Sequence, residues 1–185
     1  MTVAREVFSE LGYYGATFQE IAARADLTRP AINHYFPTKL TLYRQVVDEI
    51  NDLVIAPAVE LARTETTFES RMRAFIGTAL RAQQQDPSIA AFLVSSVLEA
   101  QRHPQLNKDR NGALEWTREF ASWVLGDAVA AGELPAGINL DITSEMLVTM
   151  LLGLAVYAGF IGTQEQLATL SEQFLGMLSG HLHIE

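Results

Sequence analysis

The sequence predicts an all-α protein, with an N-terminal three-helix helix-turn-helix domain (residues 1–45), a C-terminal helical domain (residues 46–185) and about nine helices in total. Apolar side chains recur at helical spacing along the chain, and no segment shows the strict alternation of a half-buried strand. Three helix N-caps fall within residues 17–43. The 185 residues are 49% hydrophobic and include no cysteine, so the chain can bury a sizeable core without disulfides or thiolate-bound metals.

The first three helices follow from caps and breakers. Apolar residues at helical spacing predict a first helix over residues 2–11, which a glycine ends. Thr17, followed three residues later by Glu20, is a capping box and starts a second helix. Thr28 is the next N-cap, and Pro30 lies in the first turn of the third helix, where its missing N–H costs little.

The remaining helices are longer. Thr38 caps the fourth helix, which Pro57 must kink or split because its ring clashes with the carbonyl four residues back. Asp141 is expected to cap the eighth helix, and Thr163 with Gln166 forms a second capping box. These signals predict helices over residues 39–63, 67–85, 87–102, 112–131, 142–161 and 164–182.

The charge distribution favours a nucleic-acid interface near the second and third helices. Two short helices joined by a tight turn have helix-turn-helix geometry, although an ordinary helical corner would carry the same caps. The protein has a net charge of −9, yet residues 21–44 carry four basic side chains (Arg24, Arg29, Lys39 and Arg44) against Asp26 alone. An acidic protein can bind nucleic acid through one basic patch. A basic face that is merely solvated is the alternative.

A set of short motifs spans the same region. They are Gly12-Tyr13 with Thr17, Ile21-Ala22 with Ala25, Thr28, His34-Tyr35-Phe36, and Thr38-Lys39 with Leu42. Together they resemble the N-terminal DNA-binding domain of the tetracycline-repressor (TetR) family of bacterial regulators, over roughly residues 4–50. The chain departs from that pattern at Asp26 and Pro30, where glycine is frequent, and at Asn33, where tyrosine is typical.

The resemblance implies a homodimeric, ligand-responsive transcription regulator, expected to act as a cytoplasmic repressor on double-stranded operator DNA. Thr17, Thr28, Tyr35 and Lys39 would bind phosphates, and Arg29 and Asn33 would read base edges beside Pro30 and Ala31. His34 would either contact phosphate or simply be exposed. A helical ligand-binding or structural protein without DNA binding is the alternative function.

The resemblance also assigns ligand binding and dimerisation to residues 46–185. A small apolar effector would lie among large side chains that could equally be packed core: Met72, Phe75, Phe92, Trp116, Phe120 and Trp123. The last two helices would form a four-helix bundle with a second subunit, unless they simply pack on their own domain. The expected interface residues are Gly153, Tyr157, Leu167, Leu170, Phe174 and Leu178.

No motif supports an enzyme, a cofactor or a metal. The chain lacks HExxH, P-loop, GxGxxG and GxSxG patterns. His181 and His183 lie two residues apart near the C-terminus, where chance placement explains them better than metal binding. The most apolar run, residues 146–162, contains three glycines and lacks basic flanks, so we expect a buried interface helix there and no membrane span.

Overall fold

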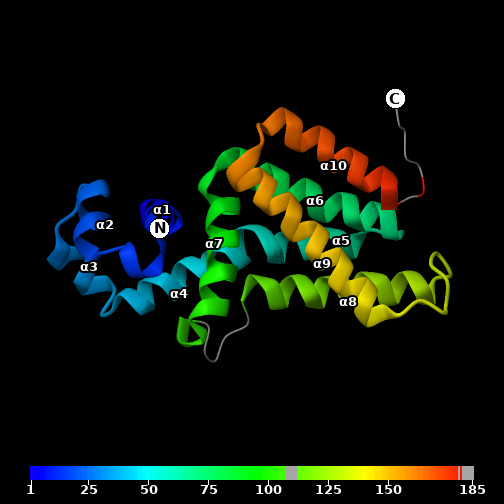
Figure 1. Cartoon of the computed structure of the whole chain (residues 1–185), viewed down its shortest axis with the longest axis horizontal. Coiled ribbons are helices and arrows are strands. Elements are labelled where there is room, and N and C mark those ends of the chain that lie inside the picture. The colour runs from blue at the N-terminus through cyan, green and yellow to red at the C-terminus, as the bar shows by residue number, and fades with distance from the viewer. Residues whose placement is uncertain (107–111, 179, 181–185) are drawn as a thin grey trace.

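The computed structural model describes residues 1–106, 112–178 and 180, and every regular element within them is helical (Figure 1). The expected all-α fold is confirmed. In chain order the elements are α1 (Thr2–Gly15), α2 (Phe18–Arg24), α3 (Arg29–Tyr35), α4 (Lys39–Ile50), η1 (Asn51–Ile55), α5 (Ala56–Thr64), α6 (Phe68–Gln85), α7 (Ser88–Arg102), η2 (Pro104–Leu106), α8 (Ala113–Ala130), α9 (Leu140–Val156), η3 (Tyr157–Ile161) and α10 (Gln164–Leu178).

The molecule has a small end, formed by α1, α2 and α3 (residues 2–35), and a large part, formed by η1 and the helices from α5 to α10 (residues 51–178). Figure 1 shows α1, α2 and α3 grouped at one end, with α4 running from them into the larger helical part. Helix α7 crosses between the two parts and packs against α1, while α8, α9 and α10 lie farther from α2 and α3. Displacements in the large part can therefore reach the small end through α4 and α7.

The three expected N-caps of the small end are present. The Thr17 hydroxyl accepts a hydrogen bond from the backbone N–H of Glu20 at 3.1 Å, and Thr28 caps α3 in the same way. Thr38 caps α4, its hydroxyl accepting from the N–H of Thr41 at 3.1 Å. The Glu20 carboxylate does not close the predicted capping box, because it pairs with Arg24 one turn later on the surface of α2.

Two residues of the small end have left-handed backbone conformations. Asp26, in the turn between α2 and α3, has φ 53°, the region that a glycine adopts with less strain. Gly12, at a kink within α1, has φ 68°. Its backbone conformation favours glycine, and a Cβ there would lie 2.9 Å from Oε1 of Glu99 on α7, so the Glu99 carboxylate would also have to shift.

The predicted break at Pro57 takes the form of a wide turn. Residues Asn51–Ile55 form a π-helix, in which the N–H of Ala56 bonds the carbonyl of Asn51 five residues back. The wider turn precedes Pro57, which then occupies the first turn of α5. The single predicted helix over residues 39–63 is therefore three consecutive segments.

The C-terminal helices follow the expected order with one correction. Asn139, rather than Asp141, caps α9, because its side-chain oxygen accepts from the N–H of Ile142 at 3.2 Å. The capping box of Thr163 and Gln166 is confirmed in both directions. The expected end of the last helix at residue 182, together with His181 and His183, lies outside the described residues.

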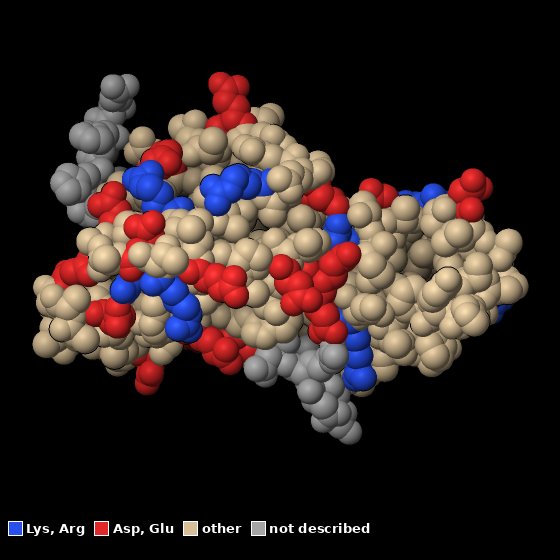
Figure 2. Space-filling view, turned by 180° about the vertical axis from the view of Figure 1, so that it is seen from behind, with Lys and Arg blue, Asp and Glu red and all other residues tan. Residues whose placement is uncertain are grey.

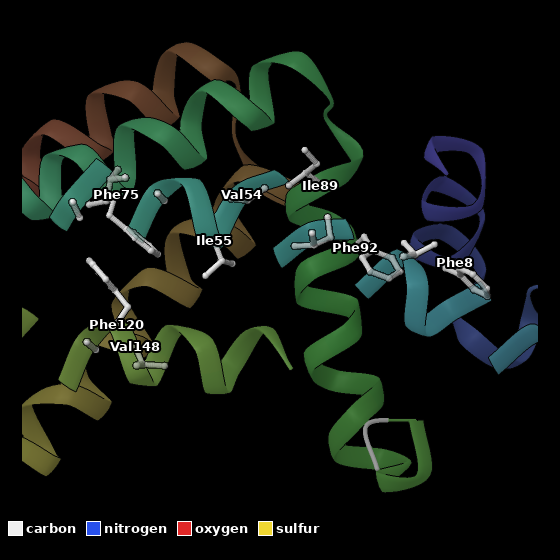
Figure 3. Packing of buried hydrophobic residues seen from close by; sticks show 14 of the residues in the cluster. Phe8, Val54, Ile55, Phe75, Ile89, Phe92, Phe120 and Val148 are labelled. Atoms are coloured by element: carbon white, nitrogen blue, oxygen red, sulfur yellow. The ribbon is translucent and has the colours of Figure 1, made fainter. Parts of the chain in front are cut away.

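The core runs continuously from the small end to the large part. Figure 3 shows Phe8 of α1 beside Phe92 of α7, and Phe75 of α6 facing Phe120 of α8. The rings of Phe75 and Phe120 stack with centroids 3.9 Å apart. Val54, from η1, lies between these two groups, so the π-turn is part of the packed interior.

Candidate functional site: an exposed helix face and an apolar cavity

Helix α3 presents a polar face to solvent. Its one buried side chain, Ile32, packs into the small end. Around it lie the residues expected to contact DNA, of which Tyr35 is 76% exposed and Ala31 is half-buried. The remaining exposed ones are Thr17, Thr28, Arg29, Pro30, Asn33 and His34. The structure thus leaves most of these predicted residues accessible to solvent.

Most of the basic side chains of this region already have partners. Arg24 pairs with Glu10 and Glu20 at 2.6 and 2.7 Å. Arg44 donates to the backbone carbonyls of Gln105 and Leu106.

Lys39 is also engaged, although it was expected to contact phosphate. Its ammonium donates to the carbonyls of Ala16 at 2.7 Å and Tyr14 at 3.4 Å, and it lies 4.6 Å from the ring centre of Tyr13. Burial lowers the pKa of Lys39 below its ordinary value. Within the described part of the chain, Arg29 is the one cation of the four with no ion-pair or hydrogen-bond partner.

The surface charge differs between the large part and the small end of the molecule. On the face shown in Figure 2, acidic side chains gather over the large part of the molecule, and the small end is mostly uncharged. Polyanionic DNA would be repelled by the large part and would meet least repulsion at the small end. Surface charge therefore favours contact between DNA and the small end over contact with the large part.

A buried arginine ties α1 to the large part. Arg5 is 2% exposed, and its guanidinium donates to Glu49 of α4 at 2.7 Å and to the hydroxyl of Ser88 at 3.0 Å. It also pairs with Asp86, in the turn between α6 and α7. Burial alone would raise the pKa of Asp86, but hydrogen bonds from Ser88 and Arg5 outweigh it and hold that pKa below its ordinary value.

The large part contains an apolar cavity of about 110 Å³. Its wall comes from η1, α6, α7, α8, α9 and α10, and is almost wholly aliphatic. The polar side chains in the wall are occupied: Ser171 donates to the carbonyl of Leu167, and Thr117 donates to that of Ala113. Gln83 donates to the carbonyls of Pro87 and Ala158 and accepts from the N–H of Ala90.

A second, more polar cavity of about 280 Å³ lies between α4, α7 and the start of α8. It shares three wall residues with the apolar cavity, namely Val97, Ala113 and Leu114. Tyr43, Arg44, Ser96, Gln101 and Glu115 also line it. No group of three or more His, Asp or Glu side chains among the described residues is arranged to hold a metal ion.

Helix α9 exposes an apolar face. Residues Leu140–Ile161 form the one described helical stretch that is long and apolar enough to cross a membrane. Only 11% of an 18-residue apolar window within this stretch is buried. Ile142 and Met146 are 61% and 54% exposed, and nothing lies within 4 Å of a Cβ built on Gly153. At these spacings the three residues share one side of the helix. Leu170 and Met177 on α10 are each 40% exposed.

Comparison with known proteins identifies a family for the N-terminal residues of the chain. A model of the bacterial regulatory proteins of the tetR family matches residues 1–46. The chain is 34% identical to the HTH-type transcriptional activator FasR of Mycolicibacterium smegmatis over 76 residues, which are 41% of this chain and 35% of FasR. It is 23% identical to the HTH-type transcriptional regulator UidR of Escherichia coli K12 over 153 residues, 83% of this chain and 76% of UidR. Residues 1–46 therefore form a DNA-binding domain of the TetR type.

The same fold is found in a solved regulator. The structure of the transcriptional regulator FadR from Bacillus subtilis, in complex with stearoyl-CoA, has a TM-score of 0.75 to this chain at 20% identity. The match covers 98% of this chain and 96% of FadR. The shared fold therefore extends over both the small and the large part of the chain.

The aromatic residues predicted to line the ligand cavity mostly lie elsewhere. Only Phe75 lies in the cavity wall. Met72, Phe92 and Phe120 are fully buried core, and Trp116 packs against that core. Trp123 lies under the guanidinium groups of Arg63 and Arg71, at 4.9 and 5.1 Å. Mostly aliphatic residues form the cavity wall instead, and a search for aromatic side chains in the sequence could not find them.

The residues predicted for the dimer interface point in different directions. Gly153 and Leu170 are exposed, whereas Tyr157 and Leu178 are half-buried. Leu167 and Phe174 face the core of their own subunit, with 4% and 8% exposure. Those two side chains are therefore not available to a partner in this conformation. The residues that the sequence reasoning missed, Ile142 and Met146 above all, follow a spacing of four along α9.

Proposed function

We propose that this chain is a TetR-family regulator, a homodimeric transcription repressor that leaves its operator when a small apolar ligand binds. The observation that carries the DNA-binding half is the accessible face of α3, on which Arg29 has no intramolecular partner among the described residues. Arg29 is the natural reader of a guanine edge, and Asn33 one turn later suits an adenine. Thr28 and Tyr35 are also exposed and suit phosphate contacts.

A gel-shift assay with the DNA upstream of the protein's own gene tests this half. Arg29→Ala is expected to weaken binding to the preferred site by about 1–3 kcal/mol and to relax preference at one base pair per half-site. Arg24→Ala is the matched control, because Arg24 is held by Glu10 and Glu20 and should not read bases. Equal weakening on all sequences would contradict base reading by Arg29, and absence of any retarded complex would favour a protein without DNA binding.

The apolar face of α9 and α10 supports the dimer. A soluble monomer would leave Ile142, Met146 and Phe160 in water, and contiguous exposed apolar surface marks an interaction site. A second copy of the same face would cover it with twofold symmetry. Two subunits are needed because paired reading helices must sit about 34–36 Å apart to meet successive major grooves.

Sedimentation of Met146→Glu tests the dimer without disturbing the core, because the side chain is already exposed. The variant should be monomeric and should lose DNA affinity while keeping the helical circular dichroism spectrum of the folded subunit. Leu61→Glu, at an exposed apolar position on α5, is the control and should remain dimeric. A dimeric Met146→Glu would place the interface elsewhere. Phe174→Glu is not a usable test, since it would disrupt the subunit's own core.

The proposed signal passes from the cavity to α1 through contacts that already exist. Gln83 forms part of the cavity wall and holds the turn between α6 and α7 by bonding Pro87 and Ala90. That turn carries Asp86, which pairs with Arg5 of α1. On the opposite wall, Val54 belongs to the π-turn that continues into α4. A ligand that enlarges the cavity would move both connections and change the separation of the two α3 helices.

A further inference from the structure

We infer that each operator half-site carries a guanine and an adenine on neighbouring base pairs, read by Arg29 and Asn33, and that methylation of the N6 amine of this adenine prevents binding. This inference rests on the proposed DNA binding and specifies the base chemistry that α3 reads. The two side chains lie four residues apart on the same side of the helix, and both are exposed.

The hydrogen-bonding groups of both side chains are available to DNA. Within the described part of the chain, the Asn33 amide has no hydrogen-bond partner, and neither has the Arg29 guanidinium. Arg24, on the preceding helix, is held by Glu10 and Glu20 and lacks this freedom. Helix α3 itself contains no acidic residue that would repel DNA. Base recognition by Arg29 and Asn33 therefore breaks no existing contact of the protein.

The spacing of Arg29 and Asn33 determines how far apart their bases lie. Four residues span about 6 Å along a helix, at about 1.5 Å per residue. In zinc-finger helices that enter the major groove, side chains three or four residues apart contact successive bases. The long Arg29 side chain can adjust to the position that the short Asn33 side chain fixes. We therefore expect the two bases on neighbouring base pairs.

The side chains beside Asn33 allow the helix to lie deep in the groove. A single CH₂ group separates the asparagine amide from the backbone, so the backbone of α3 must come close to the base edges. Pro30, one turn earlier, is exposed and Ala31 is half-buried. Both are short and uncharged, so neither holds the helix away from the bases.

Adenine methylation would remove one half of the Asn33 contact. An asparagine pairs with adenine bidentately: its carbonyl accepts from the N6 amine and its amide donates to N7. One hydrogen of that amine pairs with thymine, and the other points into the major groove. In a duplex with N6-methyladenine, the methyl group takes the place of this second hydrogen. It removes the donor and occupies the position of the asparagine oxygen, so the methylated half-site should not bind.

Selection of the preferred site from random duplexes, followed by substitution of single purines, tests the inference with the full chain. Each adenine of the selected site is replaced in turn by N6-methyladenine, and each guanine by 7-deazaguanine, which lacks the N7 acceptor. One adenine and one guanine per half-site should be sensitive, on neighbouring base pairs. The methylated adenine should weaken wild-type binding by about 5- to 150-fold, the range of one bidentate contact. The loss with 7-deazaguanine should be smaller, because O6 remains.

Variants assign each sensitivity to one side chain. Asn33→Ala should bind the unmodified and the N6-methylated duplex equally, while keeping its sensitivity to 7-deazaguanine. Arg29→Ala should show the reverse. His34→Ala is the matched control, because His34 is the next exposed residue of α3 and should keep both sensitivities. Circular dichroism spectra check that each variant is folded.

Two classes of result would contradict the inference. Sensitive purines that are not on neighbouring base pairs, methyl sensitivity that persists in Asn33→Ala, or full binding of every methylated duplex would overturn this inference alone. If the protein retards no duplex at all, the proposed DNA binding fails, and this inference fails with it.

Discussion

Replacement of Arg5 by methionine is the sharpest test of how α1 is held to the rest of the molecule. Methionine keeps the apolar contacts of the arginine stem, but it is shorter by the guanidinium group and removes every donor. Glu49 and Asp86 would then lie in the same junction without their shared cation. Breaking a buried ion pair by removing one partner is more damaging than replacing the whole pair.

The expected magnitude follows from the burial of the three groups. Removing one partner of a fully buried pair costs about 3–5 kcal/mol. Arg5 is 2% exposed, but the side chains of Glu49 and Asp86 are 27% and 20% exposed and can recover some hydration. We therefore expect a loss of about 2–3 kcal/mol in the free energy of unfolding, at or just below the lower limit of that range. For a chain of this size that corresponds to a fall of about 5–10 °C in Tm.

Urea unfolding and thermal unfolding of Arg5→Met measure this loss directly. Arg73→Met is the matched control, because Arg73 also pairs with two carboxylates but is 49% exposed, so its loss should be about 0–1 kcal/mol. Arg5→Met should also hold its DNA complex less tightly, since α1 is released from α4 and α7. If Arg5→Met unfolds with the same free energy as Arg73→Met, the arginine is not the link between the two parts.

Four further outcomes are expected. Asp26→Gly should raise the unfolding free energy by up to about 1 kcal/mol in urea titration, because Asp26 has φ 53°; a loss would contradict the strain. Lys39→Met should lower stability by about 1–2 kcal/mol, because its hydrogen bond to the carbonyl of Ala16 is lost. The salt dependence of DNA binding should stay unchanged; a slope of log K against log salt that is smaller by about one unit would show that Lys39 contacts a phosphate. Phe120→Ala should cost about 3–5 kcal/mol by denaturant titration, as a core residue stacked on its neighbour; a small cost would return it to the cavity wall. The depressed pKa of Asp86 gives a contribution to stability that is complete above the unfolded-state value of about 3.9 and is lost as pH falls below it, so acid titration of Asp86→Asn should show a smaller loss than wild type.

Local signals predicted the small end well because caps act within one turn of a helix. Thr17, Thr28 and Thr38 each bond a backbone N–H three residues later, as their spacing implies. Pro57 likewise disturbs the helix within one turn, although the sequence could not show that the disturbance would be a π-turn. Asp141 was a misleading cap because Asn139, two residues earlier, competes for the same role and succeeds.

Charge counting overestimated the basic patch because it ignores partners distant in sequence. Arg44 bonds carbonyls 61 and 62 residues away, and Lys39 bonds a carbonyl 23 residues away. Those contacts depend on how α1, α4 and α7 pack, which no window of sequence contains. Arg29 differs because it is the first residue of α3 and is exposed. The sequence predicted this position, because Thr28 directly before it is the N-cap of the helix.

The size of the apolar cavity also bears on the direction of the proposed switch. At about 110 Å³ it is smaller than a small-molecule site, so a ligand must separate elements that are now in contact. A conformation that must open to admit the ligand binds it less tightly than the opened one, and only this difference in affinity can shift the equilibrium. Gln83 opposes the opening, because its side chain joins Pro87, Ala90 and Ala158 across the cavity wall. A ligand must therefore supply enough binding energy to break the hydrogen bonds of Gln83 before the turn that carries Asp86, the partner of Arg5, can move.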